Sequence, residues 1–191
     1  MKELSIIIVN YNSGAFLQSC LESIFRETTG SFGVTVVDNA STDDSVQRIR
    51  EEGFEVQVIE NRENLGFATA CNQGFEATSA EFYLLLNPDC RIEDNAIGRT
   101  LRFLRSQERI GVVGCRVLNP DGTLQRACRR SIPRPAVAFY HFSGLSRLFP
   151  SSPRFAAYNY TYIDPEKSHP VEAVSGSFLM VRQKVVTQTG G

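Results

Sequence analysis

Apolar runs of strand length alternate with helix-like segments through the first half of the chain. Short, nearly continuous apolar runs are typical of strands buried on both faces of a parallel sheet. The runs predict five strands, at residues 4–9, 34–37, 56–59, 82–87 and 110–115. Pro88 cannot donate to a sheet ladder, so the fourth strand is expected to end at Asn87.

The segments between these strands have the spacing of helices with one buried face. Residues 15–26 place apolar side chains at 16, 17, 20, 21, 24 and 25. Further helices are expected through about residue 52, to about residue 78, and over 91–107. This β-α-β-α-β-α-β order with short connections predicts an α/β fold with a mostly parallel, Rossmann-like sheet flanked by helices.

The second half of the chain has a different character. Residues 126–170 hold six of the eight prolines, together with many arginines and aromatic residues. They predict an irregular excursion over the sheet crevice, with one short helix over 136–149. Residues 171–174 and 178–182 return to strand character before a helix from Gln183. We therefore expect three parts: an α/β half that carries the binding site over 1–125, the irregular excursion over 126–170, and the start of a second half over 171–191.

Composition narrows the range of functions. The 191 residues carry a formal net charge of −1, which gives no indication of a nucleic-acid partner. No apolar stretch is long enough to span a bilayer, and the first strand begins too close to Met1 for a signal peptide. The five cysteines form no C-x-x-C pair, so we interpret them as reduced cytosolic thiols.

Polar side chains follow three of the predicted strands at their carboxyl ends. They are Asn10 with Asn12, Asp38, and Asn87 with Asp89. In open α/β sheets ligands bind in the crevice beyond these ends, so the side chains are expected to line one site. Asp89 would hold a hard divalent cation there, although aspartate is also favoured as a turn or helix cap.

Asp38 also has two interpretations. Ser41 or Thr42 followed by acidic residues predicts the start of a helix. Asp38 precedes that start and lies at a strand end. A carboxylate there can accept a hydrogen bond from the ring N–H of a base or from a ribose hydroxyl, so we favour a ligand-binding role.

Three alternatives are weakened by what the sequence lacks. The loop after the first strand holds only Gly14 instead of G-x-G-x-x-G, which argues against a dinucleotide-binding dehydrogenase. No phosphate-loop motif occurs anywhere in the sequence, so a P-loop nucleotide site is also unsupported. The same loop has no basic residue to grip the triphosphate of a nucleotidyltransferase. A purely structural α/β domain would leave three polar strand ends unexplained.

Five short motifs occur in an order that resembles a known family. They are Val9-Asn10-Tyr11-Asn12, Val37-Asp38-Asn39-Ala40-Ser41, Asn64-Leu65-Gly66-Phe67-Ala68 with Asn72, Asn87-Pro88-Asp89, and Ser175-Gly176-Ser177-Phe178. Together they resemble the family 2 inverting glycosyltransferases of GT-A fold, and within them the bacterial rhamnosyltransferase-like branch. The resemblance covers almost the whole chain.

The resemblance implies a role for each motif. The nucleotide and donor would be bound by Val9, Asn10, Tyr11, Asn12, Asp38, Asn64, Gly66, Phe67, Asn72 and Asn87. Asp89 would be the surviving acid of the D-x-D metal motif and would hold Mg²⁺ or Mn²⁺ against the leaving diphosphate. Arg129 and Arg130 would clamp the phosphates, unless they form only a solvated basic loop. Ser175, Gly176 and Ser177 would form the acceptor side.

The function implied by the resemblance is sugar transfer in cell-surface polysaccharide synthesis. The donor would be dTDP-rhamnose or a UDP-sugar, and the acceptor a saccharide or a lipid-linked saccharide. The protein would act in the cytoplasm, at the inner face of the membrane. Self-association is also expected, because part of the family's sheet would be missing and apolar surface exposed.

The resemblance leaves the catalytic residues unassigned. Inversion by a single displacement needs a general base on the acceptor hydroxyl, which the family takes from an acidic pair beyond the position of Gly191. The chain therefore looks truncated before its base, and Glu172 is the one nearby acid. The alternative to a transferase is a non-catalytic domain or fragment that binds the nucleotide sugar.

Overall fold

The structure, a computed structural model, describes residues 2–190. The chain divides into two compact units. The first consists of Met1–Val113 with Leu179–Gly191, and the second of Gly114–Phe178. The two units are groups of residues that pack mainly among themselves. The three functional parts expected from the sequence stay a prediction.

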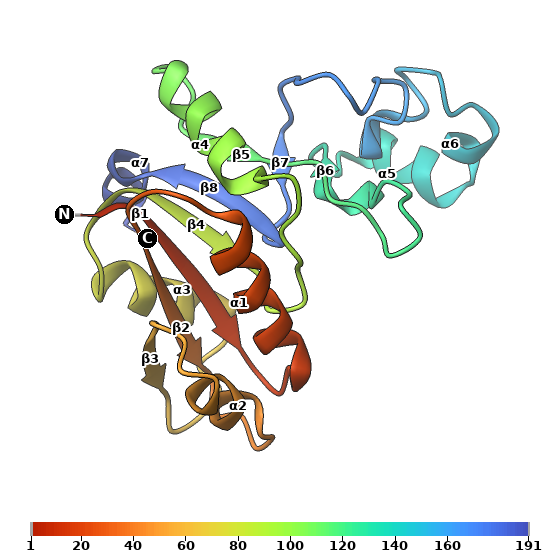
Figure 1. The fold of residues 1–191 in the computed structure, drawn as a ribbon. Coiled ribbons are helices and arrows are strands. Elements are labelled where there is room, and N and C mark those ends of the chain that lie inside the picture. The colour runs from red at the N-terminus through yellow and green to blue at the C-terminus, as the bar shows by residue number, and fades with distance from the viewer. Residues whose placement is uncertain (1, 191) are drawn as a thin grey trace. The chain divides into compact units, whose positions relative to one another are not determined.

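A six-stranded sheet in the order β3-β2-β1-β4-β8-β5 organises the first unit. Its strands are β1 (Lys2–Asn10), β2 (Phe32–Asp38), β3 (Gln57–Glu60), β4 (Ala80–Leu86), β5 (Val112–Gly114) and β8 (Phe178–Arg182). β1 pairs in parallel with β2 and β4, and β2 pairs in parallel with β3. The arrow of β8 points opposite to that of β4 (Figure 1). The predicted mostly parallel α/β sheet is confirmed.

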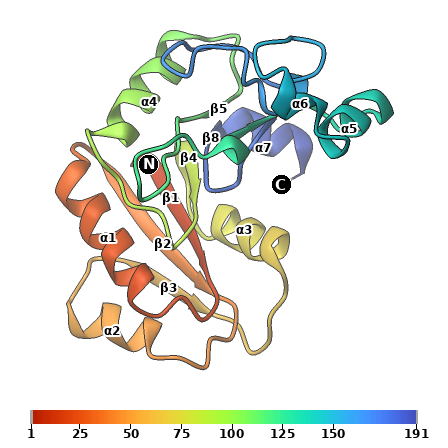
Figure 2. The same ribbon diagram turned by 90° about the vertical axis from the view of Figure 1, so that its right-hand side faces the viewer.

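Helices cover both faces of this sheet (Figure 2). One face carries α1 (Ala15–Glu27), α2 (Ser45–Glu51) and α4 (Ala96–Ser106), and the other carries α3 (Phe67–Glu76) and α7 (Gln183–Thr189). The helices can cover both faces because successive strand residues point to opposite sides. Among residues 2–190, no helix is both long and apolar enough to cross a membrane.

The core under α3 and α7 is apolar and closely packed. Ile7, Val37 and Tyr83 from the sheet pack with neighbours that include Phe75 of α3. Gly74 lets α3 come close to β1, because a Cβ atom there would lie 2.4 Å from Cγ2 of Ile7. The helix that follows β3 is therefore packed closely against the face of β1.

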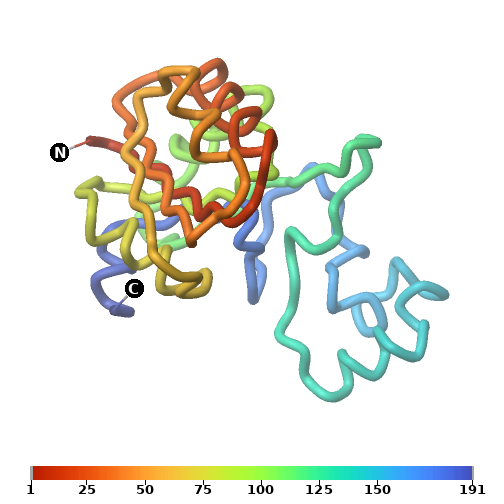
Figure 3. The backbone as a smooth tube through the Cα atoms, turned by 90° about the horizontal axis from the view of Figure 1, so that it is seen from below, coloured from red at the N-terminus to blue at the C-terminus, as the bar shows by residue number. Residues whose placement is uncertain are grey.

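The second unit has few regular elements, as its backbone trace shows (Figure 3). Its elements are η1 (Arg126–Cys128), β6 (Arg129–Arg130), α5 (Pro135–Phe142), α6 (Leu145–Leu148), η2 (Ala157–Asn159) and β7 (Ala173–Val174). β6 and β7 form a short antiparallel pair. An antiparallel bridge between Leu118 and Leu124 confirms the turn predicted there.

Two predicted helices have different bounds in the structure. The single helix expected over 136–149 is divided into α5 and α6, because Gly144 has a φ of 81° and ends the right-handed helical path. The helix expected over 91–107 begins only at Ala96. Asn95 is its N-cap, and the Asn95 side chain accepts a hydrogen bond from the Gly98 N–H at 3.2 Å.

Candidate functional site

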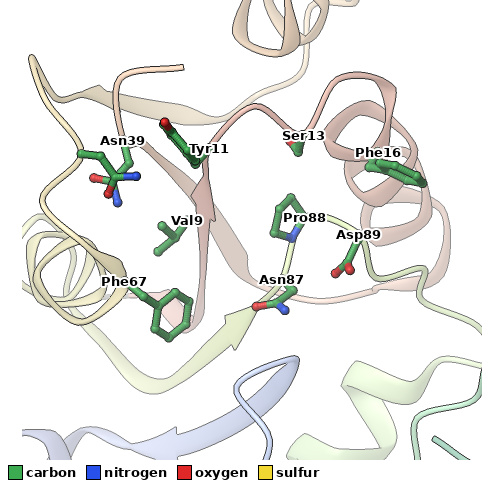
Figure 4. Close-up of a pocket in the computed structure, with 10 residues that line it drawn as sticks. Val9, Tyr11, Ser13, Phe16, Asn39, Phe67, Asn87, Pro88 and Asp89 are labelled. Atoms are coloured by element: carbon green, nitrogen blue, oxygen red, sulfur yellow. The ribbon is translucent and has the colours of Figure 1, made fainter. Parts of the chain in front are cut away.

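A cavity of about 460 Å³ opens at the carboxyl ends of β1, β2 and β4, a volume within the usual range of small-molecule sites. It is lined by Val9, Tyr11, Ser13, Phe16, Asn39, Asn64, Phe67, Asn87, Pro88 and Asp89. All ten residues belong to the first unit. Asn39 and Phe67 lie on one side of the cavity, and Phe16 and Asp89 on the other (Figure 4).

Asp89 reaches the cavity because β4 ends abruptly. The strand stops at Leu86, Pro88 has no N–H to continue the ladder, and the Cys90 N–H donates to the Asn87 carbonyl at 3.2 Å. The resulting turn leaves Asp89 exposed at the rim. Within residues 2–190 the Asp89 carboxylate forms no ion pair, so its charge is available to a ligand.

Two thiols near Asp89, those of Cys20 and Cys90, have raised pKa values. Burial raises the pKa of the Cys90 thiol to about 11, and the negative charge of Asp89 adds to this effect. Burial likewise raises the pKa of Cys20. Within residues 2–190 the structure forms no disulfide, and the interpretation of the cysteines as reduced thiols stays a prediction. Without a bound cation, Cys20 and Cys90 are therefore protonated near neutral pH.

Asp38 is buried at the end of β2 and is engaged by the protein itself. One carboxylate oxygen accepts from the Asn10 amide at 2.6 Å and from the Ser41 hydroxyl at 2.5 Å. The other accepts from the Ser41 N–H at 3.0 Å. Asn10 also donates to Ser45 at 2.8 Å. Asp38 thus fixes the turn after β2, and it does not line the cavity.

The loops after β1 and β2 are tied together at the cavity edge. Asn12 accepts from the Thr42 N–H at 2.8 Å, and Asp43 accepts from the Gly14 N–H at 2.7 Å. Despite the opposing effect of partial burial, hydrogen bonds from Ser45 and from the Gly14 N–H hold the pKa of Asp43 below its ordinary value. These bonds orient the loop that carries Tyr11 and Ser13.

A set of amides positions the start of α3. Asn39 donates to the Gly66 carbonyl at 3.2 Å and accepts from Asn61 at 2.9 Å. Gly66 has a φ of 82°, which favours glycine, and its N–H donates to Asn64 at 2.9 Å. The geometry places Asn64 and Phe67 at the cavity wall, although Gly66 itself does not line it.

The structure brings together some of the predicted donor-site residues and not others. Those that line the cavity are Val9, Tyr11, Asn64, Phe67, Asn87 and Asp89. Those outside the lining are Asn10, Asn12, Asp38, Gly66 and Asn72. The roles predicted for both groups in binding a donor stay predictions.

Sequence reasoning missed four lining residues, Ser13, Phe16, Asn39 and Pro88. Phe16 was assigned to the buried face of α1, but its side chain is 65% exposed. Ser13 donates to the Asn10 side chain instead of capping α1. Asn39 directly follows Asp38, so its position beside a polar strand end was the available indication.

The remaining predicted site residues belong to the second unit. Arg129 is buried and donates to the Ile163 carbonyl at 3.0 Å, whereas Arg130 is exposed. The carboxylate of Glu172 accepts from the Ile132 N–H at 2.9 Å and from Arg134 at 2.7 Å. The Ser175 and Ser177 hydroxyls lie 3.0 Å apart on either side of Gly176. Phosphate and acceptor roles for these residues stay predictions.

The donor set suits a divalent cation only in part. Among residues 2–190, no group of three or more histidine, cysteine or acidic side chains is placed to hold a metal ion. Asp89 supplies one carboxylate, and the amide of Asn87 lines the same cavity. Mg²⁺ is commonly bound by one or two carboxylates together with substrate phosphates and water, so Asp89 fits such a shared site.

Comparison with known proteins gives a family match over most of the chain. The profile of glycosyl transferase family 2 matches residues 5–190. The N-acetylglucosaminyl-diphospho-decaprenol L-rhamnosyltransferase of Mycobacterium tuberculosis (strain ATCC 25618 / H37Rv) is 28% identical over 199 residues, which cover 98% of this chain and 64% of that protein. The teichoic acid poly(glycerol phosphate) polymerase of Staphylococcus epidermidis is 31% identical over 101 residues, covering 51% of this chain and 14% of that protein.

Solved structures share the fold. The mannosyltransferase PcManGT from Pyrobaculum calidifontis, in complex with GDP-Man and Mn²⁺, has a TM-score of 0.66 at 18% identity and covers 100% of this chain and 47% of its own. TarS 1-349 from S. aureus, in complex with UDP-GlcNAc, has a TM-score of 0.64 at 17% identity. The match covers 98% of this chain and 47% of the TarS chain. At such identities the likeness concerns the fold alone.

Proposed function

Because the chain belongs to glycosyl transferase family 2, we propose that its 460 Å³ cavity binds the nucleotide-diphosphate sugar from which a glycosyltransferase transfers the sugar. One observation carries the proposal. Polar side chains from the ends of β1, β2 and β4 and the single carboxylate of Asp89 meet at one cavity. The chain spans 64% of the mycobacterial relative, so the activity of the whole protein is part of the proposal.

The nucleoside would lie on the side of Asn39 and Phe67. Tyr11 and Phe67 are 53% and 48% exposed, and exposed aromatic rings at a cavity offer faces on which a base or a sugar can stack. Asn39 is held by Gly66 and Asn61, so its remaining donor and acceptor capacity is fixed in direction. Asp38 would act by holding this wall in place.

The diphosphate would lie toward Asn87 and Asp89. A Mg²⁺ or Mn²⁺ ion held there by Asp89, and by the phosphate oxygens themselves, would stabilise the charge that develops on the leaving group. Asn87 in place of a second acid leaves the site with one negative charge fewer. The protein would therefore depend on the nucleotide diphosphate to complete the metal site.

The donor we propose is dTDP-rhamnose or a UDP-sugar, and the acceptor is a lipid-linked or polysaccharide saccharide. The name of the mycobacterial relative states a rhamnosyltransferase that acts on a lipid diphosphate, and the TarS complex holds UDP-GlcNAc. Such an acceptor would place the enzyme in the cytoplasm at the inner face of the membrane. The product would enter cell-surface polysaccharide synthesis.

Ligand-dependent thermal stability tests the donor and metal roles of Asp89. UDP or dTDP with Mn²⁺ is expected to raise the unfolding temperature of the wild-type chain, because binding stabilises the folded state by mass action. Asp89→Asn should lose the metal-dependent part of this rise. The control Glu81→Gln removes an exposed charge from the opposite end of β4 and should keep it. An Asp89→Asn protein with an unchanged metal-dependent rise would show that Asp89 is not the ligand.

A further inference from the structure

A second cavity, of about 140 Å³, lies entirely within the second unit. It is lined by Arg126, His141, Ser146, Arg147, Ala156, Tyr158, Asn159 and Thr161. Two guanidinium groups, an imidazole, an amide and three hydroxyls are present, and no carboxylate. We propose that this cavity binds a phosphate group.

The charge around the cavity has one sign. Between Asp121 and Asp164 the chain contains six arginines and no acidic residue, although the whole sequence has a net charge of −1. The six are Arg126, Arg129, Arg130, Arg134, Arg147 and Arg154. This segregation concentrates positive potential on one short stretch, which attracts a multiply charged anion.

The two arginines that line the cavity are available to a ligand. Arg129 donates to Ile163, Arg134 is paired with Glu172, and Arg154 donates to the Tyr140 hydroxyl. Arg126 and Arg147 have neither an ion pair nor a hydrogen-bond acceptor among the described residues. A phosphate group offers the planar guanidinium bidentate, charge-assisted hydrogen bonds.

The polar wall between these arginines is held in place by packing. The Tyr158 ring lies 4.5 Å from the ring of His141, and the Tyr158 carbonyl accepts from the Ser131 N–H at 2.9 Å. Ala156 beside it is buried. These contacts hold the imidazole and the phenol ring at the cavity wall.

The cavity volume limits the ligand. At about 30 Å³ per water molecule, 140 Å³ holds a few waters, or one phosphate or diphosphate group. A whole nucleotide sugar belongs in the larger cavity. Next to the lining residues, Phe142 is 86% exposed and Leu148 is 73% exposed. The phosphate group could therefore come from a soluble ester or from the headgroup of a lipid whose apolar chain contacts these side chains.

Calorimetric titration of the full chain with inorganic pyrophosphate tests the proposal. EDTA is present throughout, so that a metal-dependent donor site contributes no binding. Arg126→Gln and Arg147→Gln should each weaken the affinity by about tenfold or more, as expected for loss of a charged hydrogen bond. Both side chains are exposed, so the variants should fold. Arg102→Gln removes an equal charge from α4 and should change the affinity less than twofold.

Farnesyl diphosphate in the same titration distinguishes the two sources of the phosphate group. Tighter binding than pyrophosphate would identify a lipid ester, and equal binding a soluble one, provided that both arginine variants weaken it. Saturating UDP should leave pyrophosphate binding unchanged, which separates this cavity from the donor cavity. The proposal is overturned if no binding occurs at millimolar ligand, if UDP displaces pyrophosphate, or if Arg102→Gln weakens binding as much as the other variants.

Discussion

At the scale of single residues, Asn10 connects three stretches of chain that meet beside the 460 Å³ cavity. Its buried amide nitrogen lies within hydrogen-bond distance of Asp38, Ser41 and Ser45, and its oxygen accepts from Ser13. Asn10 thus acts as a donor toward a buried carboxylate, a role that no carboxylate can take over at neutral pH. This asymmetry makes the residue testable by an isosteric change.

Asn10→Asp is expected to lower the free energy of unfolding at pH 7 by about 2–4 kcal/mol, because it places a second carboxylate against Asp38 and removes the donor. The loss should shrink as the pH is lowered, because repulsion between the two carboxylates favours protonation of one of them. Urea denaturation at several pH values measures this. The control Asn12→Asp keeps the acceptor that Thr42 uses and should change stability by less than about 0.5 kcal/mol.

Ala40 is a second residue whose local conformation affects stability, because its backbone is strained. Its φ is 62°, in the left-handed region that an L-residue with a Cβ atom adopts only at an energetic penalty. Ala40→Gly should therefore raise the free energy of unfolding by about 0.5–1 kcal/mol. Ala68→Gly in α3 should have the opposite effect, since glycine disfavours helix. Equal destabilisation by the two changes in urea titrations would contradict the strain at Ala40.

Single residues also show where sequence reasoning stops. The sequence placed polar side chains at the ends of β1, β2 and β4, and six predicted residues do line one cavity. The sequence favoured Asp38 as the ligand-binding residue at the end of β2, whereas of Asp38 and Asn39 only Asn39 lines the cavity. Neighbouring strand residues point to opposite sides, so the choice depended on which side chain Ser41 and Asn10 would bind. That information lies in contacts between distant segments.

At the scale of elements, Arg182 joins α4, β4 and the segment that leads into β5 within the first unit. Its guanidinium donates to the carbonyls of Leu104, Gln107 and Ile110 and lies 5.2 Å from the ring centroid of Phe82. The Leu104 and Gln107 carbonyls also accept from the Gln107 and Ile110 N–H groups, at 3.2 Å and 3.0 Å, and Arg182 gives each a second, charged donor. One planar side chain at the end of β8 therefore completes the helix end and fixes it against the sheet.

Arg182→Lys should lower the free energy of unfolding by about 2–3 kcal/mol, because an ammonium group cannot reach three carbonyls and stack on a ring at the same time. Chemical denaturation followed by circular dichroism measures the loss. Arg102→Lys on the exposed surface of α4 serves as the control and should be nearly neutral. If the two variants were equally stable, the contacts of Arg182 would contribute little.

The elements that the sequence predicted best have a strong apolar pattern. Residues 178–182 coincide with β8, and the expected helix from Gln183 is α7. The order of strands in the sheet was not predicted, because hydrophobic pattern gives the faces of a strand and not its neighbours. Division of the expected helix at Gly144 is likewise decided by the backbone of a single residue.

At the scale of the whole molecule, buried thiols make stability depend on alkaline pH. Burial raises the pKa of Cys71 from 9.0 to about 11, so the folded state retains a proton that the unfolded chain loses. The contribution of Cys71 to the free energy of unfolding is complete below about pH 9. It is lost as the pH rises to about 11, by about 2–3 kcal/mol at most.

Cys71→Ala and Cys71→Ser should both flatten this decline between pH 9 and 11, whatever their stability at pH 7. Urea denaturation across this pH range gives the slope for each protein. The comparison of slopes removes the packing cost of each substitution, since that cost does not change with pH. A slope identical to that of wild type in both variants would exclude Cys71 as a source of the pH dependence.

The order β3-β2-β1-β4-β8-β5 places the last of the six strands in chain order inside the sheet. On the ribosome, β1 to β4 emerge first and can assemble, while β4 keeps one open edge until the entire second unit and β8 have followed. Open strand edges are templates for pairing with other chains. The nascent protein therefore passes through a long interval in which its β4 edge is open to mispairing, and the arrival of β8 ends that interval.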